Sequence, residues 1–111
     1  MAETREQKMA ELARRAANTI DERGLFQGDF YDPWETDPDK CAVCAIGALR
    51  LAVTGRPDAE ADDEALVQDT ITSFARFLGV DHVPDWSDEA GRTTADVRDA
   101  YRRFGNSLLA A

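Results

Sequence analysis

Apolar residues recur at helical spacing in three segments, each preceded by residues that start helices. The first segment follows the capping-box sequence Thr4-Arg5-Glu6-Gln7 and ends at Gly24. The second runs from the acidic residues 58–64 to Gly79, and the third begins at Thr93. Spacings of three and four residues place these side chains on one face, so we expect three amphipathic helices. Their expected core faces are Met9, Leu12, Ala13, Ala16 and Ile20; Leu66 or Val67, Ile71, Phe74, Ala75 and Leu78; and Val97, Ala100, Tyr101, Phe104 and Leu108.

A fourth helix is expected around an uncharged run from Cys41 to Leu49, in a chain with 22 acidic and 13 basic residues. A helix that is apolar on every side is normally surrounded by other elements. Asp37-Pro38 has the composition of an N-cap and first turn, and Gly55 of a stop, which predicts a helix over 38–54. Gly47 costs about 1 kcal/mol relative to alanine inside a helix. We therefore expect a neighbouring helix to approach it closely.

The remaining segments, 27–40 and 80–92, are predicted to be ordered loops. The first contains three aromatic residues, Phe30, Tyr31 and Trp34, and the second contains Val80, His82, Val83, Pro84 and Trp86. The chain shows no strand-like alternation and no internal repeat. Its 111 residues are enough for one core. The sequence predicts an all-α, single-domain antiparallel bundle of about four helices with two ordered aromatic loops, spanning 1–111.

The net charge of −9 argues against binding to nucleic acids or anionic membranes through bulk electrostatics. It permits a basic protein partner, or mimicry of a nucleic acid as a special case. The first 20 residues do not resemble a signal peptide, and the longest apolar run is too short to cross a bilayer. We expect a cytoplasmic protein. The sequence gives no indication of its oligomeric state.

Cys41 and Cys44 have the C-x-x-C spacing of redox motifs, but no βαβ pattern surrounds them. We expect two reduced, buried, structural thiols and no metal or other cofactor. The alternative is a zinc site formed by Cys41, Cys44 and His82. A chain with one histidine and no phosphate loop or nucleophile elbow does not favour an enzyme.

Two stretches carry the candidate binding residues. The acidic, aromatic loop 29–39 suits a basic partner surface, and the segment 85–94 concentrates unusual residue types before a helix start. We expect a binding or regulatory module that acts through protein–protein interaction. The alternative is a small-molecule site or enzyme with a pocket roofed by Trp34, Trp86 and Arg92. The candidate residues are Tyr31, Trp34, Glu35, Trp86, Asp88 and Arg92.

The segment 85–94 also has a structural interpretation. Trp86 would fill the end of the bundle with its indole N–H bonded to a backbone carbonyl, and Asp88 would accept from amides of its own turn. Arg92 would pair with Asp88 or with an acid of the loop 29–39. In the functional interpretation Arg92 instead faces a cleft and binds an anionic ligand.

Two motifs resemble those of a known family. Cys44-Ala45-Ile46-Gly47-Ala48-Leu49 is similar to a central Cys-Ala-x-Gly-Ala-Leu helix, and Trp86 to Thr93 is similar to a Trp-Asn-Asp-x-x-Gly-Arg-Thr loop. Together they resemble an uncharacterised family of short helical bacterial and phage proteins, a domain of unknown function. The resemblance implies a fold type and no activity.

Overall fold

Five helices form the part of the chain described by the structure, a computed structural model covering residues 3–29, 31–37 and 40–110. They are α1 (Arg5–Arg23), α2 (Ala45–Thr54), α3 (Glu64–Leu78), α4 (Val83–Ser87) and α5 (Thr94–Leu109). Within these residues two isolated bridges are the only β-type pairing. One hydrophobic cluster draws on all five helices, which confirms the expected all-α, single-domain fold.

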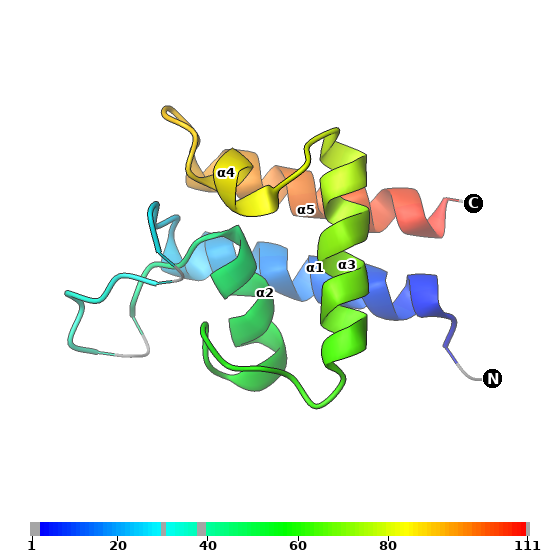
Figure 1. The fold of residues 1–111 in the computed structure, drawn as a ribbon, viewed down its shortest axis with the longest axis horizontal. Coiled ribbons are helices and arrows are strands. Elements are labelled where there is room, and N and C mark those ends of the chain that lie inside the picture. Colours follow the sequence, from blue (N-terminus) through cyan, green and yellow to red (C-terminus); the bar gives the residue numbers. More distant parts are fainter. Residues whose placement is uncertain (1–2, 30, 38–39, 111) are drawn as a thin grey trace.

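The longest helices form the base of the fold. Figure 1 shows α1 and α5 side by side in opposite directions, with α3 crossing both. Each of these three helices contacts the other two. Both long helices begin with the predicted capping signals: Thr4 pairs reciprocally with Gln7, and Thr93 with Asp96. Each pair satisfies backbone N–H groups at a helix start. The sequence therefore sets the first residues of this layer.

An aromatic cluster joins α3 to α5 at the centre of the core. Phe74 stacks on Tyr101 with 4.2 Å between ring centroids, and it also contacts Phe104 and Trp86. Tyr101 is fully buried, and its hydroxyl donates to the carbonyl of Ala45 at 2.7 Å. Burial raises the pKa of this hydroxyl far above its usual value, so it remains a protonated donor.

The start of α2 differs from the prediction. The helix begins at Ala45, whereas we expected residues 38–54 to be helical, and Pro38 lies outside the described residues. Cys44 is the N-cap, with its sulfur accepting from the Gly47 N–H at 3.3 Å. An uncharged run is compatible with any buried backbone conformation. The Cys44 thiol takes the N-cap role that we predicted for Asp37. Gly47 is buried, but whether a helix approaches it closely stays a prediction.

The residues before α2 form an extended segment instead of a helical turn. The N–H and carbonyl of Val43 bond to Gly24 and Phe26 on one side. On the other side the carbonyl of Ala42 accepts from Asp32. The bridges Leu25 to Val43 and Tyr31 to Val43 reflect this pairing. Backbone hydrogen bonding of this kind satisfies the buried polar groups that a helix would otherwise have paired internally.

The segment 80–92 is not entirely loop, because it contains the short helix α4 with Pro84 in its first turn. Ser87, the last residue of α4, is fully buried and its hydroxyl accepts from the Ala45 N–H at 3.2 Å. This bond joins the end of α4 to the start of α2. A five-residue helix is too short for periodicity to reveal, which is why the sequence predicted four helices.

A partly buried ion pair between α2 and α3 provides a pH prediction. Arg50 bonds to both carboxyl oxygens of Glu64 at 2.8 Å, and this pairing lowers the pKa of Glu64 from 4.5 to about 2. Because the folded-state pKa is the lower one, the pair stabilises the fold above about pH 4.5 and loses this effect as the pH falls towards 2. Glu64→Gln should therefore be less stable than wild type at neutral pH, with the difference shrinking in acid. Urea unfolding of both proteins between pH 7 and pH 2 measures it, and a constant difference would contradict the assignment.

Candidate functional site

Trp86 and Arg92 lie together, but they do not face a cleft. The Arg92 guanidinium covers the Trp86 ring at 4.2 Å from its centroid. Its Nε donates to the Trp86 carbonyl at 3.0 Å, and its terminal nitrogen pairs with Glu89 at 2.6 Å. The other ring contact of Trp86 is edge-on to Phe74. Arg92 therefore stabilises the link between α4 and α5 with the same groups that would bind an anion.

The two loops are tied together by residues other than Arg92. The Asp88 carboxylate accepts from the Gly28 N–H at 2.9 Å, across the gap between the loops. The side-chain amide of Gln27 donates to the carbonyls of Ser87 and Glu89 at 3.2 and 2.8 Å. We expected Asp88 to bond its own turn and Arg92 to make the connection. The described residues contain no bond between Trp86's indole N–H and a backbone carbonyl either.

The Trp86 environment leads to a stability prediction. Trp86 is half-buried, so Trp86→Ala should reduce the free energy of unfolding by about 2 kcal/mol, below the loss from a fully buried aromatic. Arg92→Ala should reduce it by about 1 kcal/mol or less, since a partly exposed ion pair and cation–π contact are each weak. Chemical denaturation of both variants gives the comparison. A larger loss for Arg92→Ala would show that the guanidinium, rather than the indole, holds this link.

The acidic loop has an ordered base and an exposed tip. Tyr31 is half-buried and paired by its backbone, whereas the side chain of Trp34 is 87 % exposed. Asp32 accepts from the Trp34 N–H at 2.9 Å, and Glu35 accepts from the Asp37 N–H at 3.1 Å. These local bonds shape the turn without covering the indole. Trp34 and Glu35 are therefore exposed to solvent, and they are not part of the Trp86–Arg92 contact.

The candidate zinc ligands are not assembled. Cys41 and Cys44 are both buried, whereas the His82 side chain is 65 % exposed and lies 3.4 Å from Asp85. No group of three or more potential ligands occurs in the described residues. Burial raises the pKa of the Cys44 thiol, the opposite of what a metal-binding or redox-active cysteine requires. In this structure Cys44 serves as a helix cap.

None of the three best-formed hollows on the described surface is lined by Trp34, Trp86 or Arg92. The largest is an open groove of about 850 Å³ between α1 and α5. A second, of about 510 Å³, lies between α2, α3 and α4, and the third is about 220 Å³ beside Asp88. The pocket expected beneath the two tryptophans is therefore not among them.

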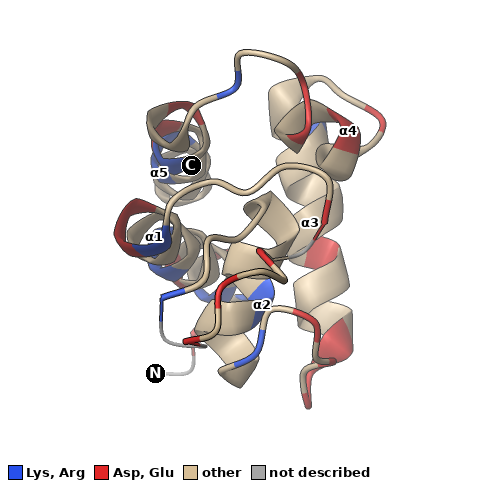
Figure 2. Cartoon of the chain, turned by 90° about the vertical axis from the view of Figure 1, so that its left-hand side faces the viewer, with Lys and Arg blue, Asp and Glu red and all other residues tan. Residues whose placement is uncertain are grey.

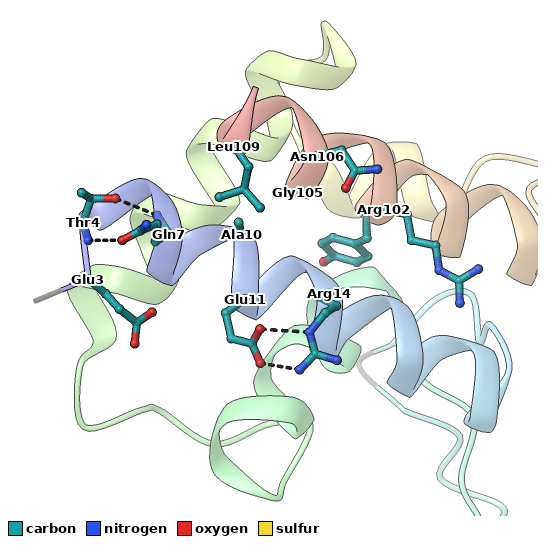
Figure 3. A pocket seen from close by; sticks show the side chains of 11 residues that line it. Glu3, Thr4, Gln7, Ala10, Glu11, Arg14, Arg102, Gly105, Asn106 and Leu109 are labelled. Carbon is teal, nitrogen blue, oxygen red and sulfur yellow. Dashed lines mark hydrogen bonds and ion pairs between the residues drawn. The ribbon is translucent and has the colours of Figure 1, made fainter. Parts of the chain in front are cut away.

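The α1–α5 groove was not anticipated from the sequence. Its floor includes Ala10 and Gly105, and its rim carries charged side chains and Leu109, which is 60 % exposed (Figure 3). A Cβ added to Gly105 would lie 3.4 Å from the Ala10 carbonyl oxygen and 3.5 Å from Ala13 Cβ. The signal available in the sequence was the presence of small residues, Ala10 and Gly105, on these two helices.

Charge is distributed unevenly between the layers. Together α1 and α5 carry eight basic and six acidic residues, a net charge of +2. The rest of the chain carries five basic and 16 acidic residues, a net charge of −11. Figure 2 shows acidic positions on the helices as well as along the loops that connect them. The acidic excess of the chain therefore lies outside α1 and α5.

These features define a small all-α protein with one core, an exposed acidic loop and open grooves. Within the described residues no helix is both long and apolar enough to span a bilayer. Residues 4–106 match the model of a family of unknown function (DUF6197), and the chain belongs to this family. The expected resemblance to a family of unknown function is thus confirmed, whereas its motifs and origin stay predictions. Comparisons with curated proteins and with solved structures found no match.

Proposed function

We propose that this protein is a small interaction module whose acidic loop, residues 31–37, docks on a basic surface of another protein. The observation that carries the proposal is Trp34, an indole 87 % exposed between Asp32 and Glu35. Tryptophan is enriched among the residues that dominate binding energy at protein interfaces. Leaving an indole in water has no benefit for the fold. Trp34 is thus the anchor, and the acids around it select a partner of opposite charge.

The loop is suited to this role because its base is fixed. Backbone pairing of Asp32 with Ala42 joins it to the extended segment before α2, and Asp88 and Gln27 hold the preceding turn. A loop held in place before binding loses less conformational entropy when a partner arrives. As part of the same proposal we place the interaction in the cytoplasm, where a buried thiol such as Cys44 stays reduced.

The alternative, a small-molecule or enzyme site near Trp34, Trp86 and Arg92, has less support. Arg92 directs its donors to the Trp86 carbonyl and to Glu89, and no described hollow includes these residues. A binding site of that class normally has convergent polar groups around an apolar pocket. We therefore retain the protein-interaction proposal alone.

Affinity capture from the source cell with matched variants tests the proposal. Wild-type bait should retain a basic protein, and raising the salt concentration should release it because exposed charges are screened. Trp34→Ala should lose this protein, Trp34→Phe should retain part of it, and Glu35→Gln should weaken it. Asp62→Asn removes a charge of the same sign from a separate exposed site and should have no effect. Capture that is unchanged in Trp34→Ala would refute the proposed function.

A further inference from the structure

The two tryptophans of the chain have similar acidic neighbours but different surroundings. Trp86 is followed three positions later by Glu89, and Trp34 lies between Asp32 and Glu35. The Trp86 ring is half-buried and covered by an arginine, whereas Trp34 is 87 % exposed. Among the described residues no cation lies over the Trp34 ring. Trp86 thus shows, within this chain, how an indole beside carboxylates can be covered.

Arg92 contacts the ring and the carboxylate with different parts of one guanidinium. Its carbon Cζ lies 4.2 Å from the centroid of the Trp86 ring, and a terminal nitrogen donates to Glu89 at 2.6 Å. Both contacts are possible together because the group is planar: its faces lie on the ring while its N–H groups point outwards at the edge. A lysine ammonium is more strongly hydrated and has no flat face. This arrangement therefore favours arginine over lysine.

The carboxylates beside Trp34 are oriented by the loop, and each keeps one oxygen without a hydrogen bond. Asp32 Oδ1 accepts from the Trp34 N–H at 2.9 Å, and Glu35 Oε1 accepts from the Asp37 N–H at 3.1 Å. Within the described part of the chain neither Asp32 nor Glu35 forms an ion pair, and their other carboxyl oxygens accept no hydrogen bond. Guanidinium and carboxylate groups form strong, charge-assisted hydrogen bonds. An exposed indole and two such oxygens therefore occur together in one turn.

We propose that the acidic loop binds an arginine of its partner protein, which stacks on the Trp34 indole and donates to Asp32 or Glu35. This inference rests on the proposed function and names the side chain that the partner's basic surface presents. Residues 31–37 include three acids and no base, so the charge around the indole selects a cation. Tryptophan and arginine are also the residue types enriched at interface hot spots.

Nuclear magnetic resonance of the full chain tests the choice of arginine. The two tryptophans give two indole N–H signals, and Trp34→Phe identifies one of them by its loss. A blocked peptide of alternating arginine and glycine should shift the Trp34 signal but not the Trp86 signal, since Arg92 already covers that ring. The lysine peptide of the same length and charge should bind about fivefold more weakly. Equal affinity for both peptides, or no shift of the Trp34 signal, would overturn the inference.

Matched variants separate stacking from charge, with binding followed by the backbone amide signals of the loop. Trp34→Ala should bind the arginine and lysine peptides equally weakly, because only the charge attraction remains. Glu35→Gln should weaken both peptides by a similar factor and keep the preference for arginine. Asp62→Asn, which removes a charge of the same sign at a separate exposed site, should change neither affinity. A preference for arginine that persists in Trp34→Ala would refute stacking on this indole.

The inference and the proposed function fail in different ways. The peptide titration measures the preference for arginine, whereas the capture experiment scores whether Trp34 holds a partner protein. Capture that depends on Trp34, together with equal affinities for the two peptides, would overturn arginine as the bound residue and leave the proposed function standing. A preference for arginine in the titration, together with capture that does not depend on Trp34, would refute the proposed function.

Discussion

Phe74→Ala is expected to lower the free energy of unfolding by about 3–5 kcal/mol, the range for truncating a buried aromatic residue. Phe74 is 1 % exposed and contacts three other rings, so a vacant site would be bordered by α3, α4 and α5 at once. Large aromatic neighbours cannot relax fully into such a space, and the cavity adds to the loss of burial. Urea unfolding followed by circular dichroism measures the change.

Phe77 provides the matched control for this prediction. It lies on the same helix and loses the same atoms on substitution, but it is 40 % exposed and contacts one ring, that of Phe104. Phe77→Ala should therefore cost about 1 kcal/mol, less than half the effect at Phe74. Equal losses for the two variants would show that the stacked cluster is not the centre of the core.

Gly105→Leu should reduce stability by about 3 kcal/mol, at the upper end of overpacking effects. The backbone of α1 lies directly opposite, since a Cβ at this position would already be 3.4 Å from the Ala10 carbonyl oxygen. A leucine must place three further carbons there, which would push α1 and α5 apart. Thermal or urea unfolding measures the loss. Full stability in this variant would mean that the helices separate without loss of packing.

Gly105→Ala is the matched control for the leucine variant. The added methyl is tight against Ala10 and Ala13, but alanine gains about 1 kcal/mol over glycine inside a helix. The two effects oppose each other, so stability should change by less than about 1 kcal/mol. A graded response from glycine to alanine to leucine would identify helix approach as the cause.

The three amphipathic helices could be predicted because spacing and caps agree. Thr4 and Thr93 each have a partner residue three positions later, and Gly24 and Gly79 close the helices as expected. The beginning of α2 could not be predicted in this way. An uncharged run carries no periodicity, so extended backbone and helix are equally compatible with it, and Cys44 is an unusual cap.

The candidate site was harder to predict than the helices because residue types do not indicate which partners they choose. The sequence is compatible both with a binding cluster and with a structural role for Trp86, Asp88 and Arg92. The interatomic distances in the structure show that their bonds hold the loops in place. Trp34 is likewise a tryptophan in a segment rich in acidic residues, yet its side chain is exposed to solvent. The α1–α5 groove depends on two helices far apart in sequence, which no local pattern reveals.

The pairing of α1 with α5 has a consequence for the order in which the chain is completed. The apolar face of α1 finds its largest partner in the last helix, and Leu25 also bonds to Thr94, 69 positions later. During synthesis from the N-terminus, α1 must wait with its core residues uncovered until α5 has left the ribosome. Such long-range closure slows folding and leaves apolar surface open to wrong contacts. Nascent chains stopped before Thr94 should therefore bind chaperones, whereas chains released after Leu109 should not.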